Sequence, residues 1–112
     1  MQLAFDHVPE DILVADSNKC FRYANQAACQ SLGYTKKELE NLRIPDIAPN
    51  HENQRYQEHL RELREGKTLS YHTTYQTKFG QKLSVNISIY LLNLQGQEFT
   101  CAITSLSKKT VD

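Results

Sequence analysis

The sequence predicts an α+β domain in which one antiparallel sheet is covered by a set of short helices. The C-terminal stretch Tyr71–Lys109 alternates apolar and polar residues in three runs, which are joined by turns at Gly80 and Gly96. Such alternation has the period of a β-strand. The region from Asn25 to Gly66 contains short segments that begin at capping residues and end at glycines, which is typical of helices.

Length and composition narrow the class of protein. The chain has 112 residues, which suits one domain with one core. Thirteen basic and thirteen acidic side chains cancel, so net charge favours neither nucleic acid nor an anionic membrane as a partner. Mean hydropathy is −0.60, and no apolar run approaches the roughly 20 residues of a membrane span. We therefore expect a cytoplasmic domain that does not insert into a membrane.

The three cysteines are Cys20, Cys29 and Cys101. Their odd number and wide spacing argue against a disulfide framework or a zinc site. Each has apolar neighbours, so we interpret them as thiols that act as small hydrophobic residues in a reducing compartment.

The N-terminal quarter predicts a β-hairpin. Residues 1–8 are an arm or the end of a helix. Ile12–Ala15 is a short apolar run, Asp16–Lys19 is a turn cluster, and Cys20–Ala24 alternates. This alternation places Phe21 and Tyr23 on the face opposite Cys20, Arg22 and Ala24.

Two short helices follow the hairpin. Asn25 is placed to cap a helix over residues 26–32, which ends at Gly33. Thr35 and Glu38 have the spacing of a capping box, in which each side chain bonds the backbone N–H of the other.

The longest helix is predicted over His51–Glu65, with Asn50 as its cap and Gly66 as its end. Before it, the proline-bounded segment Ile44–Pro49 has room for about one helical turn. Spacings of three and four place one apolar stripe on the long helix, formed by Tyr56, His59, Leu60 and Leu63.

The three late strands are predicted over Tyr71–Phe79, Lys82–Asn93 and Glu98–Ser107. Their alternation assigns one apolar face, which we expect to contact the helices, and one face of small polar residues. The apolar face includes Leu83, Val85, Ile87, Ile89, Phe99, Cys101 and Ile103. The polar face includes Thr74, Asn86, Ser88, Thr100 and Ala102.

Several motifs together resemble the PAS domain, a sensor module of signalling proteins. They are Tyr23–Ala28, Leu32–Leu39, Asp46–Pro49, Lys78–Gly80 and Ser105–Lys109. The resemblance implies a five-stranded antiparallel sheet in the order 2-1-5-4-3, with short helices and one longer helix on one face. It also implies a single domain with its core over residues 11–107, preceded by the arm 1–8 and followed at 108–112 by a linker to an output domain. A histidine kinase or a diguanylate cyclase is a typical output domain of this family.

Two positions depart from the family pattern. Phe79 stands where relatives have a turn aspartate, and Ser105 stands where they have the aspartate that helps couple the domain to its output helix. Ser107 keeps a hydroxyl at the position of a threonine. The resemblance therefore implies signal output through Ser105 and Ser107, without the usual ion pair.

The resemblance also implies which cofactors the domain could bind. Photoactive flavin domains of this family need a cysteine before the long helix, and Asn41–Ile47 contains none, so we expect no flavin adduct. Haem-binding relatives supply a histidine from the long helix. Their ligand position falls near Arg55, with His51 and His59 one turn to either side, so haem through His59 is a minor alternative.

We expect a ligand pocket or a dry core between the sheet and the helices. Its candidate residues are Ile47, Tyr56, His59, Leu60, Tyr75, Val85, Ile87, Cys101 and Ile103. A second reading is a dimerisation module without ligand, in which the arm and the outer sheet face form a homodimer. A third reading is a small enzyme, but the inward positions of the three late strands carry no carboxylate for acid–base chemistry. We assign no catalytic residue and no metal site.

Overall fold

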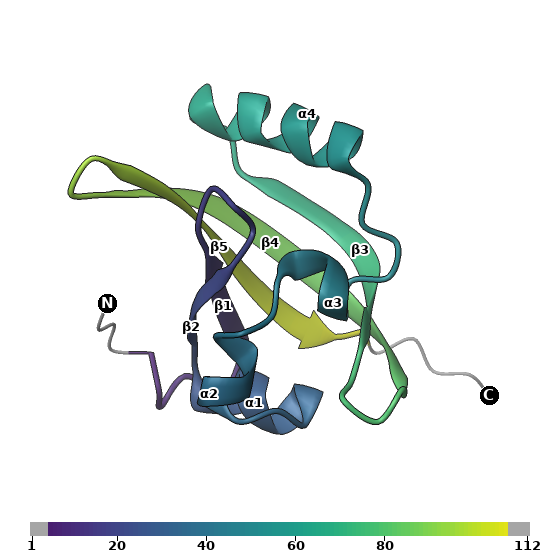
Figure 1. Ribbon diagram of the computed structural model, residues 1–112. Coiled ribbons are helices and arrows are strands. Elements are labelled where there is room, and N and C mark those ends of the chain that lie inside the picture. Colours follow the sequence, from purple (N-terminus) through teal and green to yellow (C-terminus); the bar gives the residue numbers. More distant parts are fainter. Residues whose placement is uncertain (1–4, 108–112) are drawn as a thin grey trace.

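The computed structural model describes residues 5–107 and has the predicted α+β architecture (Figure 1). Its helices are α1 (Gln26–Leu32), α2 (Lys36–Leu39), α3 (Ile44–Ile47) and α4 (Asn53–Arg64). Its strands are β1 (Asp11–Ala15), β2 (Phe21–Ala24), β3 (Leu69–Gln76), β4 (Lys82–Leu94) and β5 (Gln97–Leu106). All neighbouring strands are antiparallel, in the order β2-β1-β5-β4-β3. The fold class and strand order are therefore confirmed.

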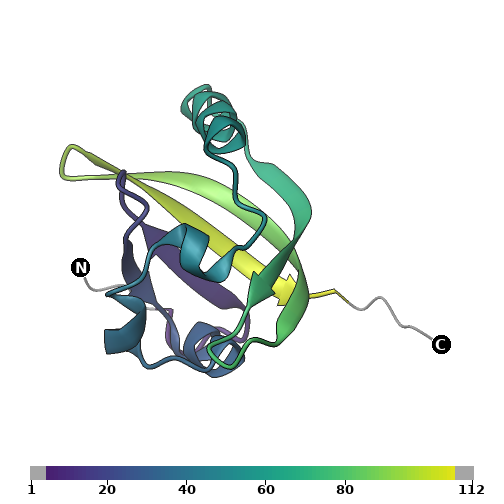
Figure 2. The ribbon, with the colours of Figure 1, turned by 45° about the vertical axis from the view of Figure 1, so that its right-hand side comes forward.

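The helices lie on one face of the sheet, which we call the inner face. In Figure 1, α1 and α2 lie at one end of the sheet and α4 at the other, with α3 between them. Figure 2 shows the same layer after rotation, with α4 seen nearly along its axis. Within residues 5–107, no helix is long and apolar enough to cross a membrane.

The helix caps follow the local sequence. The Asn25 side chain accepts from the Ala28 N–H, and Gly33 ends α1 in the left-handed conformation with φ 81°. Thr35 and Glu38 form the predicted capping box of α2. These predictions are confirmed. The local sequence was sufficient for them because each cap depends on residues only a few positions apart.

The start of α4 differs from the prediction. The helix begins at Asn53, its N-cap is Glu52, and no side chain caps it. Instead of joining the helix, His51 lies in a preceding turn, where its N–H donates to the Ala48 carbonyl at 3.0 Å. The prediction that Asn50 caps a helix from His51 is therefore wrong, and His51 sits in the connection between α3 and α4.

The turn between β4 and β5 decides which side of the sheet each residue of β5 occupies. Gln95 and Gly96 have φ 51° and 80°, as in a type I′ hairpin with a two-residue loop. Leu94 therefore pairs with Gln97, and even-numbered residues of β4 face odd-numbered residues of β5. The inner face of β5 consequently carries Thr100, Ala102 and Thr104, opposite Leu91, Ile89 and Ile87.

Phe99, Cys101 and Ile103 were predicted on the inner face, and that prediction is wrong for all three. They belong to a second apolar cluster on the outer face of the sheet. The prediction placed odd-numbered residues of both β4 and β5 on the inner face. A two-residue loop instead pairs the odd-numbered residues of β4 with even-numbered residues of β5, so the inner residues of β5 are even-numbered. The prediction of an outer Thr100 and Ala102 fails for the same reason.

A bulge changes the facing of β2. The register shifts between Val14 and Ala15, so that Leu13 pairs with Ala24 and Ala15 pairs with Phe21. Phe21 and Ala24 therefore both reach the inner core, whereas strict alternation had placed them on opposite faces.

The sheet separates two apolar cores. The inner core is formed by β-strand and helix residues that include Leu13, Phe21, Ala28, Leu32, Leu39, Ile47, Tyr75, Val85 and Ile87. The outer cluster consists of Ile12, Val14, Phe99 and Cys101, surrounded by Phe5, Val8, Tyr23, Leu92, Leu94 and Ile103. The outer face is small and polar over β3 and the adjoining part of β4, where it carries Ser70, His72, Thr74, Asn86 and Ser88.

Residues 5–8 form a turn that covers the outer cluster. The Val8 N–H donates to the Phe5 carbonyl at 3.2 Å, and the Phe5 ring meets the Tyr23 ring edge-on at 6.2 Å between centroids. The Asp6 carboxylate accepts from the Lys36 ammonium at 3.1 Å. The described part of the N-terminal arm thus packs on its own domain.

Candidate functional site

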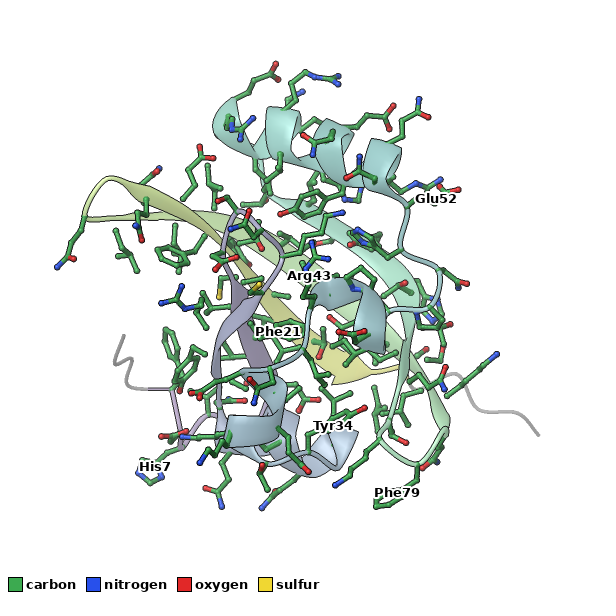
Figure 3. All side chains as sticks on the ribbon, viewed as in Figure 1. His7, Phe21, Tyr34, Arg43, Glu52 and Phe79 are labelled. Carbon is green, nitrogen blue, oxygen red and sulfur yellow. The ribbon has the colours of Figure 1, made fainter. Side chains whose placement is uncertain are left out.

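An apolar cavity of about 70 Å³ lies between the inner face of the sheet and helices α3 and α4. We call it the inner cavity. Its walls are Leu13, Ala15, Phe21, Ile44, Ile47, Tyr56, His59, Leu60, Leu63, Tyr75, Ile89, Thr100 and Ala102. Figure 3 shows the labelled Phe21 side chain among those that fill the space between sheet and helices.

Five of the predicted pocket residues line this cavity. They are Ile47, Tyr56, His59, Leu60 and Tyr75. Val85 and Ile87 are buried in the inner core but do not form part of the cavity wall. Cys101 and Ile103 lie on the opposite side of the sheet and cannot contact a molecule in the cavity.

The prediction missed the walls supplied by β1, β2 and β5. Thr100 and Ala102 line the cavity because of the parity change at the Gln95–Gly96 turn. A two-residue loop between two alternating runs was the signal that could have found them. Leu13, Ala15 and Phe21 required the strand order, which places β1 beside β5.

The size of the cavity limits what it can hold in this conformation. A water molecule needs roughly 10–15 Å³ of such space, whereas pockets for drug-sized ligands span about 300–1,000 Å³. At about 70 Å³, the inner cavity accommodates a few water molecules or a short apolar group. A haem or a flavin would require the helices to move away from the sheet.

Tyr56 and His59 give the cavity a polar end. The His59 ring packs on the Tyr71 ring with 5.0 Å between centroids. Burial lowers the pKa of His59, and the nearby Arg55 guanidinium lowers it further, against the raising effect of Glu62 and Glu58. Burial raises the pKa of Tyr56. Both side chains are therefore neutral at pH 7 and offer hydrogen-bonding groups beside apolar walls.

A second hollow of about 280 Å³, which we call the polar groove, adjoins this end. It runs between the segment 48–52, the first turns of α4 and strand β3, which is the edge of the sheet. Its walls are Ala48, Asn50, His51, Glu52, Arg55, Tyr56, His59, Tyr71, His72, Thr73 and Thr74. Figure 3 labels Glu52 at the start of α4, where its side chain is exposed.

The predicted output residues lie at the end of β5. Ser105 is exposed and pairs with Asn86 on the outer face. The Ser107 N–H donates to the Ser84 carbonyl at 2.8 Å, which continues the pairing with β4. The linker predicted at 108–112 lies outside the described residues, and the output role of both serines remains a prediction.

Among residues 5–107, no group of three or more histidine, cysteine, aspartate or glutamate side chains is arranged to hold a metal ion. His51 and His59 both line the polar groove but do not form part of such a group.

Several solved structures have the same fold. The PAS domain of an HTR-like protein from Haloarcula marismortui superposes with a TM-score of 0.82 at 23% identity, covering 92% of this chain and 85% of that one. A domain of a sensory box sensor histidine kinase/response regulator from Geobacter sulfurreducens gives 0.71 at 26% identity, covering 88% and 85%. The PAS domain of nitrogen regulation protein NR(II) from Vibrio parahaemolyticus gives 0.77 at 16% identity, covering 92% and 94%.

No curated protein matches this chain significantly. The family model of the PAS domain matches residues 9–107, which is nearly all of the sequence and spans every helix and strand described above. This chain belongs to the PAS domain family.

Proposed function

We propose that this domain is the sensory or regulatory module of a multidomain signalling protein, and that it responds to a small molecule bound in the inner cavity. Membership of the PAS family supports a sensory role. A histidine kinase or a diguanylate cyclase would be a suitable output domain.

The observation that carries this proposal is the inner cavity. It has apolar walls and, at one end, the neutral polar side chains of Tyr56 and His59, a combination that is common in ligand pockets. The cavity wall contains no aspartate or glutamate, so it supports a binding role better than a catalytic one.

The signal would leave through β5. Thr100 and Ala102 belong to the cavity wall, and the strand continues from them to Leu106. Occupancy of the cavity would shift the equilibrium between two packings of β5, and Ser105 and Ser107 would pass that shift to the output domain. This route replaces one through Cys101 and Ile103, which face away from the cavity.

The proposal is tested by native mass spectrometry and an absorption spectrum of the freshly purified protein. A retained small molecule that is lost in Ala102→Val, but kept in the control Ala27→Val, would support binding in the inner cavity. Ala27 lies on α1 and does not line the cavity. A Soret band would instead support haem ligation through His59, and a flavin spectrum would support a flavin cofactor. A ligand-free mass, together with no thermal shift from a small-molecule library, would overturn the proposal.

A second candidate function is homodimerisation through the arm and the outer sheet face. It is favoured by the apolar outer cluster, which continues to Tyr90, a tyrosine with 39% of its surface exposed. Because residues 5–8 already cover part of this cluster, exchange of the arm between two copies would preserve the same contacts.

Light scattering on the chain with and without residues 1–8 tests this second candidate. Arm exchange predicts a dimer that the truncation dissociates. A dimer that survives the truncation would contradict arm exchange and leave the sheet face itself as the interface. A monomer in both forms would contradict dimerisation altogether.

A further inference from the structure

The inner cavity and the polar groove share two wall residues, Tyr56 and His59. These side chains stand where the apolar space beneath α4 meets the polar space beside the edge of β3. One elongated molecule that passes between them would therefore have an apolar end in the cavity and a polar end in the groove.

The polar groove is lined by hydrogen-bonding groups that have no partner in the protein. The His51 Nε2 atom is buried without a hydrogen bond. Among residues 5–107, no side-chain hydrogen bond or ion pair involves His51, Arg55, Tyr56 or His59. Buried polar groups are rarely left unpaired in folded proteins, so the unpaired His51 imidazole indicates a site for a polar ligand group, and Arg55, Tyr56 and His59 lie in the same wall.

The charge around His51 favours an anion. Burial lowers the pKa of His51, and the Lys19 and Arg43 cations lower it further, with a smaller effect of His59. Both cations are held in place. The Lys19 ammonium donates to Asn53 Oδ1 at 3.0 Å and lies 4.8 Å from the Tyr56 ring centroid. The Arg43 guanidinium donates to the Asn18 carbonyl at 2.9 and 3.0 Å.

Among the wall residues of the groove, Arg55 is the one lysine or arginine and Glu52 is the one carboxylate. Both are exposed to solvent, where their fields are screened. The strand that forms the far wall, β3, is an edge strand, and such strands present unpaired main-chain N–H groups. Among residues 5–107, no backbone hydrogen bond joins the segment 48–52 to β3, so this edge stays open to a ligand.

We propose that the molecule this domain senses is a small carboxylic acid with a short apolar tail. Its carboxylate would accept hydrogen bonds from His51 and Arg55 in the polar groove, and its tail would lie in the inner cavity between Tyr56, His59 and the sheet. This inference rests on the proposed sensory function, because it names the class of ligand for the same site.

Titration calorimetry with paired probes tests the ligand class. Sodium propanoate, butanoate and hexanoate are compared with the alcohols of the same chain length on the full chain. A carboxylate held by charge-assisted hydrogen bonds should bind roughly tenfold tighter than its alcohol. Equal affinities would overturn the choice of a carboxylate while leaving a small-molecule sensor intact. If neither series binds, and native mass spectrometry also finds no ligand, the proposed function fails as well.

Two variants test the location of the carboxylate. His51→Gln and Arg55→Gln should each remove most of the preference for acid over alcohol, by weakening binding of the acid far more than binding of the alcohol. Arg61→Gln is the matched control, since Arg61 lies on the same helix, is exposed, and lines neither hollow. Arg55 is exposed, so we expect Arg55→Gln to fold. The test therefore remains valid even if His51→Gln unfolds. A preference that survives both substitutions would overturn the assignment to the polar groove.

Discussion

Asn25 pairs with both main-chain groups of Ile12. Its backbone N–H donates to the Ile12 carbonyl at 3.0 Å, and its side-chain oxygen accepts from the Ile12 N–H at 2.9 Å. The same oxygen caps α1 through the Ala28 N–H at 3.0 Å. The side-chain amide thus extends the pairing of β1 and β2 by one residue while the backbone turns into a helix.

Replacing Asn25 should be among the most destabilising single changes in this domain. Its amide nitrogen also donates to the carbonyls of Glu10 at 2.8 Å and Phe5 at 3.1 Å, and the residue is fully buried. Asn25→Ala leaves these groups unpaired, and we expect a loss of about 3 kcal/mol in the free energy of unfolding, measured by urea denaturation. Asn41→Ala is the control, because the Asn41 amide makes one exposed hydrogen bond; equal effects of the two substitutions would contradict a special contribution of the buried Asn25 network.

Thr104 carries a buried hydroxyl without a partner on the inner face of β5. Thr104→Val keeps the shape of the side chain and removes the unpaired group, so we expect stability to rise by about 1 kcal/mol in chemical denaturation. In the matched variant Thr77→Val, stability should fall, since the Thr77 hydroxyl accepts from the Gln81 N–H at 3.1 Å. A destabilised Thr104→Val protein would mean that its hydroxyl is satisfied in solution.

The β4–β5 turn places a glutamine in a conformation that favours glycine or asparagine. Gln95 has φ 51°, the left-handed region that costs most side chains energy. Gln95→Asn should therefore raise the midpoint of thermal unfolding, by an amount that corresponds to a few tenths of a kcal/mol up to about 1 kcal/mol.

Gly96→Ala should lower the midpoint, because Gly96 has φ 80° and alanine is strained there by about 1–2 kcal/mol. If Gln95→Asn and Gly96→Ala shifted the midpoint in the same direction, the type I′ geometry would be wrong.

Stability should decline as the pH falls below about 6.5. Burial lowers the pKa of His51 and His59 in the folded protein from the ordinary value of 6.5. Between that value and the lower folded-state pKa, the unfolded chain binds protons that the folded chain does not, so protonation favours unfolding. Thermal melts from pH 7.5 to 5.5 should show this loss.

The double variant His51→Gln, His59→Gln should flatten that pH dependence. His7→Gln is the control variant, because His7 is exposed. A wild-type melting temperature that is constant across the same pH range would contradict the proposed burial of the two imidazoles.

The sequence by itself determined the fold class, most of the elements, and the caps of α1 and α2. The caps of α1 and α2 could be predicted from Asn25, Gly33 and the Thr35–Glu38 capping box, because each cap depends on groups a few residues apart. Alternation located β4 and β5 to within one residue of their observed bounds. Five of the nine predicted pocket residues line the inner cavity, because Ile47 on α3, the apolar stripe of α4 and Tyr75 on β3 were assigned to their correct sides.

The tertiary structure decided which residues of β1, β2 and β5 face the cavity. One added residue or one two-residue loop inverts the facing of a whole strand, and this happened at the β2 bulge and at the Gln95–Gly96 turn. It also decided that His51 lies outside α4, beside cations from distant segments such as Lys19 and Arg43. Local pattern specifies each element, whereas the polar groove exists only because the folded chain brings α4, the segment 48–52 and the edge of β3 together.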